Sequence, residues 1–198
     1  MKILGSHNSC TGYKLVGWQK LFAPLLNLFS KCQKKSLEQQ FKEGVRLFDL
    51  QVNLKDGRWI ASHGTTWYDI EPFGVLNELS IRYNEKVYVY LGLDKHFFHP
   101  YEIDKFYNMR NQIELSCPNL EIKRVYLEGP YRIVYDDHDF SSKLVAKYWS
   151  LTWAKEKAGG KWWKAYFYLP IPILWKKLYK EEWDKFKEDA EYYITDFV

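Results

Sequence analysis

Two histidines in short, turn-like contexts are the residues whose types and spacing could do chemistry. His7 lies in the segment GSHNS at positions 5–9, and His63 lies in SHG at positions 62–64, 56 residues further along the chain. Histidine is the side chain whose ordinary pKa lies nearest neutrality, so a facing pair can supply a general base and a general acid at one pH. Cleavage of a phosphodiester by in-line displacement needs such a pair.

An acidic residue interrupts the apolar run GVRLFDLQV at positions 44–52, between the two histidines. Side chains alternate along a strand, so Asp49 and Gln51 share one face. Each histidine ends a short apolar stretch, and catalytic groups of parallel barrels lie at the carboxyl ends of the strands. One register therefore gathers His7, Asp49, Gln51 and His63 around a single axis. The alternative interpretation is structural: the histidines cap loops, and Asp49 pairs with a basic residue because an unpartnered buried carboxylate is costly.

Strand-like runs alternate with helical stretches along the chain, which predicts an α/β fold with a parallel sheet. About eight strands indicate a compact, distorted (β/α)8 TIM-type barrel that occupies residues 1–198 as a single domain. The candidate strands are 2–5, 45–52, 59–63, 87–93, 122–127, either 133–135 or 144–148, 165–169 and 192–198.

Three helices have clear signals. Ser36 opens a capping-box pattern, SLEQ, before a short helix that Gly44 ends. Residues 101–115 and 173–191 carry apolar stripes at helical spacing. The cluster DDHD at 136–139 favours a solvated loop over a metal site, since contiguous side chains cannot all face one ion.

Composition limits the class of partner. The 198 residues carry 29 Lys and Arg against 25 Asp and Glu, a formal charge of +4, which does not favour nucleic acid as a partner. Three widely spaced cysteines without a CxxC pair predict neither a disulfide framework nor a zinc site, and they favour a reducing compartment. The first motif follows Met1 directly and no long apolar run occurs, so we expect no signal peptide and a cytoplasmic protein. No sequence signal bears on the oligomeric state.

In their order and spacing, three segments together resemble the X-domain of phosphatidylinositol-specific phospholipase C and its bacterial relatives. These segments are GSHNS (5–9), GVRLFDLQV (44–52) and DGRWIASHG (56–64). The resemblance covers residues 3–64 and extends to 87–94 and 192–198. It implies a distorted (β/α)8 barrel and intramolecular attack of the inositol 2-hydroxyl on phosphorus.

The resemblance also implies roles for individual residues. His7 would be the general base, His63 the general acid on the leaving oxygen, and Asp49 a metal ligand or a partner of the catalytic machinery. Asp196 would hold His7 in its working tautomer. A divalent metal, calcium by preference, would bind Asn8, Asp49, Gln51 and Asp94, which are all oxygen donors.

Gln51 departs from both branches of the family, which place an acidic calcium ligand or a phosphate-stabilising arginine there. A neutral amide predicts weak metal binding. The alternative is a metal-free site in which a nearby cation, Lys95, stabilises the charge on phosphorus.

Two aromatic, lysine-flanked stretches, 18–29 and 161–177, predict either peripheral contact with a membrane or ordinary packed helices. The first contains Trp18, Leu21 and Phe22, and Pro24 should start or kink its helix.

Three functions remain open. The first is a phosphodiesterase that cleaves a phospholipid or a soluble phosphodiester through a cyclic phosphate. The second is an enzyme for glycerophosphodiesters or sphingomyelin-like lipids, which the single acid at 49–51 disfavours. The third is a catalytically impaired barrel that binds headgroups or a protein partner, which the presence of both His7 and His63 disfavours.

Overall fold

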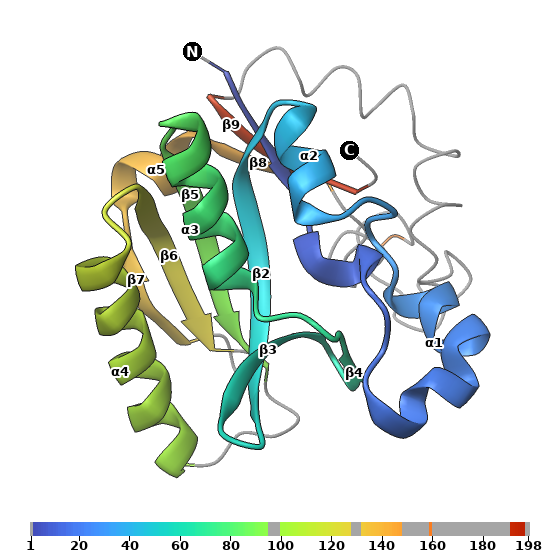
Figure 1. Cartoon of the computed structure of the whole chain (residues 1–198). Coiled ribbons are helices and arrows are strands. Elements are labelled where there is room, and N and C mark those ends of the chain that lie inside the picture. Colours follow the sequence, from blue (N-terminus) through green and yellow to red (C-terminus); the bar gives the residue numbers. More distant parts are fainter. Residues whose placement is uncertain (1, 95–99, 128–131, 148–158, 160–190, 197–198) are drawn as a thin grey trace.

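The computed structural model describes residues 2–94, 100–127, 132–147, 159 and 191–196. Within these ranges, one sheet has the order β7-β6-β5-β2-β1-β9-β8; off this path, β3 pairs with β2 and β4 pairs with β3 (Figure 1). The strands are β1 (Ile3–Ser6), β2 (Val45–Lys55), β3 (Arg58–His63), β4 (Thr66–Trp67), β5 (Val87–Leu93), β6 (Leu120–Leu127), β7 (Arg132–Asp136), β8 (Leu144–Lys147) and β9 (Tyr192–Thr195).

The central strands form the parallel, curved arrangement expected of a barrel. Strands β6, β5, β2, β1, β9 and β8 are paired in parallel, and β7 joins the edge antiparallel to β6. The two edge strands of this path, β7 and β8, do not pair with each other in the part of the chain that the structure describes. The observed fold is therefore a mixed α/β sheet, open over the described residues and compatible with a distorted barrel.

Helices cover the outer face of this sheet. They are α2 (Leu37–Lys42), α3 (Pro72–Tyr83) and α4 (Pro100–Ser116), whose apolar residues pack with Phe48, Leu50 and Leu91 in the main core (Figure 1). The predicted capping box of α2 is confirmed: the Gln39 N–H donates to Ser36 Oγ, and the Ser36 N–H donates to Gln39 Oε1. The helix predicted at 101–115 is confirmed as α4.

The inner face of the sheet carries a second, smaller apolar cluster, formed by Leu47, Phe140, Tyr192 and Ile194. Asp49 lies two residues beyond Leu47 on the same face of β2, toward the carboxyl end of the strand. The apolar cluster thus fills the interior below the polar residues, and this places the polar site at the mouth.

One predicted strand has a different role from the one we expected. Residues 59–63 belong to β3, which is the antiparallel partner of β2 in a hairpin rather than a further parallel strand of the barrel. Asp56 and Gly57 form its turn, both with positive φ (49° and 76°), as a tight two-residue hairpin requires. His63 consequently reaches the mouth from a hairpin.

The acidic cluster at 136–139 also differs from the predicted loop. Asp137 caps α5 (His138–Lys143) by accepting the Phe140 N–H, and its carboxylate pairs with Lys123. The predicted elements at 165–169 and 173–191, and the aromatic stretch at 161–177, lie outside the described residues.

Candidate active site

His7 directly follows β1, and its side chain is hydrogen-bonded to the buried carboxylate of Asp196, the residue that directly follows β9. Its Nδ1 lies 2.7 Å from Asp196 Oδ1, and Asp196 is fully buried. The His7 N–H donates to the Thr195 carbonyl at 2.9 Å, which continues the β1–β9 ladder to this point. Because a carboxylate only accepts, Nδ1 carries the proton of the neutral ring and Nε2 keeps its lone pair. This is the tautomer that a general base needs.

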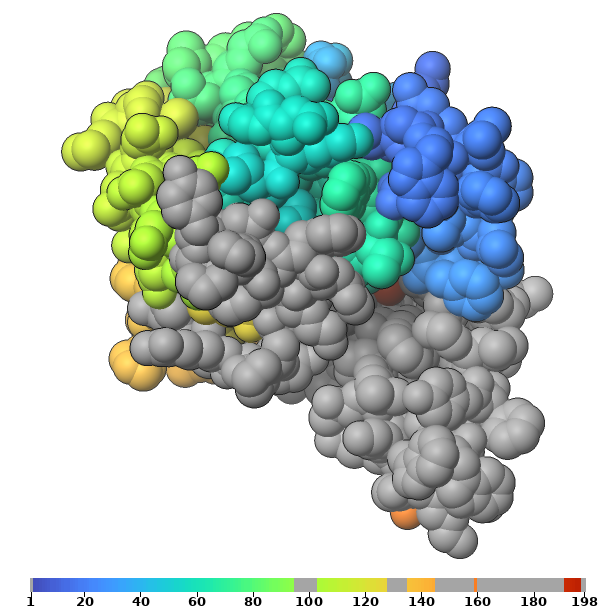
Figure 2. Space-filling model, turned by 90° about the horizontal axis from the view of Figure 1, so that it is seen from below, coloured from blue at the N-terminus to red at the C-terminus, as the bar shows by residue number. Residues whose placement is uncertain are grey.

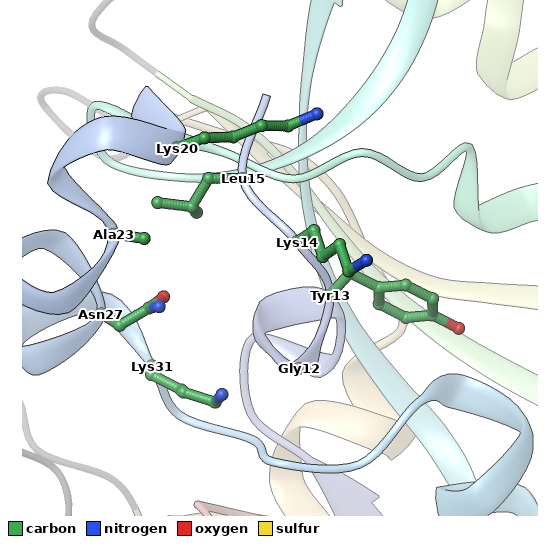
Figure 3. Close-up of a pocket in the computed structure, with 8 residues that line it drawn as sticks. All are labelled: Gly12, Tyr13, Lys14, Leu15, Lys20, Ala23, Asn27 and Lys31. Carbon is green, nitrogen blue, oxygen red and sulfur yellow. The ribbon is translucent and has the colours of Figure 1, made fainter. Parts of the chain in front are cut away.

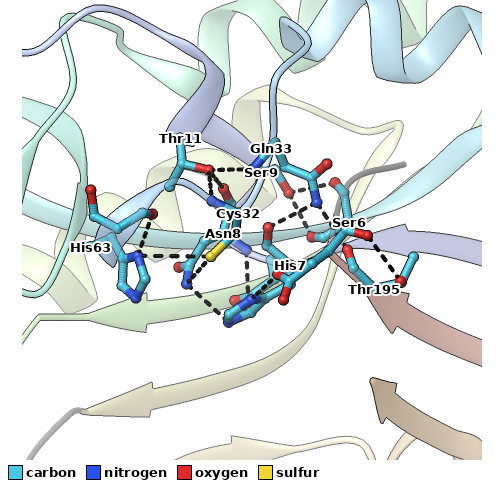
Figure 4. A network of polar contacts seen from close by, with 12 residues as sticks. Ser6, His7, Asn8, Ser9, Thr11, Cys32, Gln33, His63 and Thr195 are labelled. Atoms are coloured by element: carbon cyan, nitrogen blue, oxygen red, sulfur yellow. Dashed lines mark hydrogen bonds and ion pairs between the residues drawn. The ribbon is translucent and has the colours of Figure 1, made fainter. Parts of the chain in front are cut away.

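The second nitrogen of His7 faces Asn8 and Asp49. Nε2 lies 2.9 Å from Asn8 Nδ2 and 3.7 Å from Asp49 Oδ2, and the Asn8 N–H reaches the same carboxylate oxygen at 3.3 Å. The amide donates to Nε2, which agrees with the tautomer set by Asp196. The residues predicted to carry the base chemistry therefore meet at one point, as Figure 4 shows for His7 and Asn8.

Asn8 adopts a backbone conformation that is uncommon for residues other than glycine. Its φ of 43° and ψ of 57° lie in the left-handed region, which asparagine tolerates better than most residues. Its side chain is 2% exposed, and Oδ1 has no hydrogen-bond partner within the described structure. A buried, unsatisfied amide oxygen beside a carboxylate is suited to a hard cation.

His63 is held by a helix that the sequence did not link to it. Its Nδ1 donates to the Ser30 carbonyl at 2.8 Å, and Ser30 is the last residue of α1 (Ala23–Ser30). Tyr68 fixes Ser30 in turn, because its hydroxyl donates to Ser30 Oγ at 2.9 Å. The open Nε2 of His63 is therefore the nitrogen available to a substrate.

The two histidine rings face each other across the mouth. Their centroids are 6.1 Å apart and the ring planes are inclined by 76°. This separation leaves the rings out of direct contact and permits groups on one phosphorus centre to reach both. Burial, followed by the charge of His7, lowers the pKa of His63 to about 4.

The lowered pKa of His63 predicts a measurable pH dependence. In a proton NMR titration of the free protein, the His63 ring should titrate near pH 4, and a bound phosphodiester anion should raise that midpoint by at least about one unit. The unfolded chain binds this proton near pH 6.5, so folding stability should fall as pH drops from about 6.5 to 4. The variant H63Q should lose this component of acid sensitivity. A midpoint near 6.5 in the free protein would contradict the assignment.

Asp49 has a further neighbour that the sequence analysis missed. The Tyr126 hydroxyl, from β6, lies 3.5 Å from Asp49 Oδ1, and Tyr126 crosses β5 at Gly92 to reach it. A Cβ at Gly92 would lie 2.2 Å from Tyr126 Cζ, so only glycine leaves room for this crossing.

The substitution G92A should therefore displace the Tyr126 ring from Asp49. We expect a loss of about 1–3 kcal/mol in the free energy of unfolding, typical of overpacking, together with reduced turnover. Denaturant unfolding measures the first and an activity assay the second. The control Y126F removes the hydroxyl and leaves the ring in place. A G92A variant as stable as the parent protein would contradict the packing described.

The other predicted ligands lie near the same mouth. Gln51 follows Asp49 on the inner face of β2, and Asp94 directly follows the adjacent strand β5. Gln51 is paired in register with Gly92, and the Asp94 N–H donates to the Val52 carbonyl at 3.2 Å. Lys95 lies outside the described residues.

Cys32 is the other residue that sequence reasoning did not place in the site. Its Sγ lies 3.9 Å from Asn8 Nδ2 and 4.0 Å from His63 Nδ1, between the two histidines (Figure 4). Gln33 follows it and donates to the His7 and Thr195 carbonyls at 3.1 and 2.9 Å. The loop after α1 thus completes the network around the first histidine.

The segment leading to this loop exposes an unusual number of apolar side chains. It consists of the 3-10 helix η2 (Gly17–Phe22) and α1, and we call its exposed residues the apolar rim. These residues are Trp18, Leu21, Phe22, Leu25, Leu28 and Phe29, of which Leu21 is 81% and Trp18 68% exposed. Figure 2 shows this segment (blue) at the surface when the molecule is viewed toward the carboxyl ends of the parallel strands.

A lysine-lined hollow adjoins the apolar rim. The hollow has a volume of about 460 Å³, and Lys14, Lys20 and Lys31 line it together with Asn27 (Figure 3). Lys20 lies 4.0 Å from Asp69, whereas Lys14 and Lys31 make no ion pair with any described residue. Apolar residues and cations thus occupy the same side of the molecule as the mouth.

No helix in the described part of the chain has the length and apolar content needed to cross a bilayer.

Comparison with known proteins gives a likeness in structure only. No model of a protein family matches the sequence, and no curated protein matches it. The phosphatidylinositol-specific phospholipase C of Listeria monocytogenes superposes with a TM-score of 0.55 at 14% identity, covering 100% of this chain and 88% of that one.

The Staphylococcus aureus enzyme gives the same result. A double mutant of it superposes with a TM-score of 0.56 at 14% identity over 98% of this chain and 84% of that one. Another of its structures, from work on modulating its membrane binding, gives 0.53 at 16% identity over 99% and 85%. The chain therefore has the fold of the bacterial phosphatidylinositol-specific phospholipases C.

Proposed function

We propose that this protein is a phosphodiesterase of the phospholipase C type that cleaves an inositol phosphodiester, with a phosphatidylinositol as its lipid form. The observation that carries the proposal is the pair of facing histidines, 6.1 Å apart, of which His7 is fixed in the base tautomer by Asp196 at 2.7 Å. A protein that only binds headgroups needs neither the pair nor the carboxylate behind it.

The two histidines would divide the proton transfers of one displacement. His7 Nε2 takes the proton of a substrate hydroxyl, and that oxygen forms a bond to phosphorus. The bond from phosphorus to the leaving oxygen breaks, and His63 gives its proton to that oxygen. When the attacking hydroxyl belongs to the inositol ring, the product is a cyclic phosphate.

His63 must be protonated to act as the acid, although its pKa in the free protein is about 4. A phosphodiester anion bound between the rings would raise that pKa by direct charge interaction. The Ser30 carbonyl at the carboxyl end of α1 also favours the protonated ring. Substrate binding and acid catalysis are thereby coupled.

We further propose that calcium binds beside His7, held by Asn8, Asp49, Gln51 and Asp94. The buried Asn8 Oδ1, without a hydrogen-bond partner among the described residues, supports this assignment, as does the Asp49 carboxylate next to it. Calcium takes oxygen ligands in flexible geometries, and it would neutralise charge that develops on the phosphoryl oxygens. Two carboxylates and two amides predict weak binding.

The apolar rim supports peripheral contact with a membrane. Exposed Trp, Leu and Phe side chains next to lysines are typical of segments that lie in the lipid interface, where the lysines meet anionic headgroups. α1 carries part of this surface and ends at Ser30, whose carbonyl binds His63. Lipid contact would therefore lie beside the catalytic mouth.

A soluble substrate tests the chemistry without the membrane. We expect the protein to release nitrophenol from a nitrophenyl ester of inositol phosphate in the presence of calcium, and to slow at least about tenfold in EDTA. Equal rates in EDTA would move charge stabilisation from calcium to a protein cation. No release by folded protein would overturn the proposed function.

The two alternative functions have less support. Enzymes that hold magnesium through paired acids need a second carboxylate where Gln51 stands, and no described acidic residue other than Asp49 lies on that part of β2. In a barrel that only binds a ligand, the interaction of His7 with Asp196 would have no function.

A further inference from the structure

Three potential metal ligands at the mouth lie close together and form a different set from the ligands proposed for calcium. A ring nitrogen of His7, the Cys32 sulfur and a carboxylate oxygen of Asp196 all lie within 4.8 Å of one another. All three side chains are buried, and His7, the most open, is 7% exposed. Among the described residues this is the single group of three or more His, Cys, Asp or Glu side chains with ligand atoms so close.

The donor types of this group differ from those proposed for calcium. Calcium takes oxygen ligands, whereas a set of nitrogen, sulfur and oxygen suits zinc. A tetrahedral zinc site places its donors about 3.3–3.7 Å apart, given metal–ligand distances of about 2.0–2.3 Å. The observed group needs shifts of about 1 Å or less to reach this spacing.

The surroundings of Cys32 also suit a bound cation. Asp196 is fully buried, and its charge, after burial itself, contributes to the raised pKa of the Cys32 thiol. A divalent cation would replace the thiol proton and offset the carboxylate charge in the same buried space. Asn8 turns its amide nitrogen toward the group, since Nδ2 lies 2.9 Å from His7 Nε2 and 3.9 Å from Cys32 Sγ. The three donors therefore leave the fourth tetrahedral position to a ligand from solvent.

We propose that zinc binds His7, Cys32 and Asp196 and switches the site off. Metal on Nε2 of His7 would occupy the lone pair of the base directly. Metal on Nδ1 would force the remaining ring proton onto Nε2, with the same result. The binding stands independently, whereas its inhibitory effect rests on the proposed function. Zinc and calcium would then have opposite effects on one enzyme.

Cobalt spectroscopy tests the binding without an activity assay. We expect EDTA-stripped protein to bind one cobalt(II) ion with a thiolate-to-cobalt charge-transfer band in the near ultraviolet, which zinc abolishes by displacement. C32S should lose the band. The matched control C117S removes a half-buried thiol elsewhere and should keep it. A band of equal intensity in C32S, or no band in the parent protein, would overturn the proposal.

Zinc inhibition and X-ray absorption complete the test. Zinc near one equivalent should inhibit the parent protein and C117S, and C32S should need roughly 100-fold more. If C32S does not fold, the zinc X-ray absorption spectrum of the parent protein decides, since a first shell without sulfur would overturn the proposal. A thiolate band in a protein that turns over no substrate would refute the proposed function and leave the metal site standing.

Discussion

Replacing His7 by alanine should reduce turnover of both lipid and soluble substrates by about 10²–10⁴-fold, because no other described side chain at the mouth combines a lone-pair nitrogen with a carboxylate behind it.

Replacing His63 by alanine should have an effect that depends on the leaving group. An alkoxide such as diacylglycerol needs a proton, whereas nitrophenolate leaves almost unaided. H63A should therefore lose about 10²–10⁴-fold on phosphatidylinositol and much less on the nitrophenyl ester.

His138 provides the matched control for both histidine variants. It is exposed at the start of α5, and H138A should leave both rates unchanged. Equal losses of turnover by H63A on the two substrates would contradict the assignment of His63 as the general acid. Full activity of H7A, with an unchanged melting temperature, would contradict the assignment of His7 as the general base.

The double substitution L21A/L25A should weaken binding to phospholipid vesicles by roughly 30–1000-fold and leave turnover of the soluble ester unchanged. The two side chains are 81% and 59% exposed, so removing them costs little packing in water, whereas each loses about 1–2 kcal/mol of transfer into lipid. Sedimentation with sucrose-loaded vesicles measures the binding.

I81A/L115A is the matched control for this prediction. Both side chains are exposed apolar residues, on α3 and α4, away from the apolar rim. Vesicle binding should remain unchanged in this variant. If both double variants bind vesicles as the parent protein does, the rim is not the membrane contact.

The sequence was sufficient to predict the central part of the fold and of the site. Alternation along β2 placed Asp49 inside, and the capping box located α2, because both signals are local. His7, Asn8 and Asp49 lie together in the structure because β1 and β2 are adjacent and parallel, and their predicted roles stay predictions. Asp196 lies beside His7 as predicted.

The role of β3 was predicted wrongly, although a signal was present. The Asp-Gly pair at 56–57 is a strong hairpin signal between two apolar runs, and it implies an antiparallel partner of β2 rather than a new barrel strand. Counting apolar runs without their turns overestimated the number of parallel strands.

Other parts of the site depend on tertiary contacts that no local pattern shows. Cys32 and Ser30 reach His63 only because the segment from η2 to the end of α1 returns to the mouth. Gly92 gave a partial signal, since a glycine within an apolar strand often permits close approach. Its partner Tyr126 lies 34 residues later, and the sequence alone could not connect them.

The measurement that tests the central claim most directly is ³¹P NMR of phosphatidylinositol vesicles incubated with the protein in calcium. The two-histidine displacement predicts a resonance of a cyclic inositol phosphate as the first product, absent with H7A. An acyclic inositol phosphate as the first product would contradict intramolecular attack, and no product from folded protein would contradict the enzyme itself.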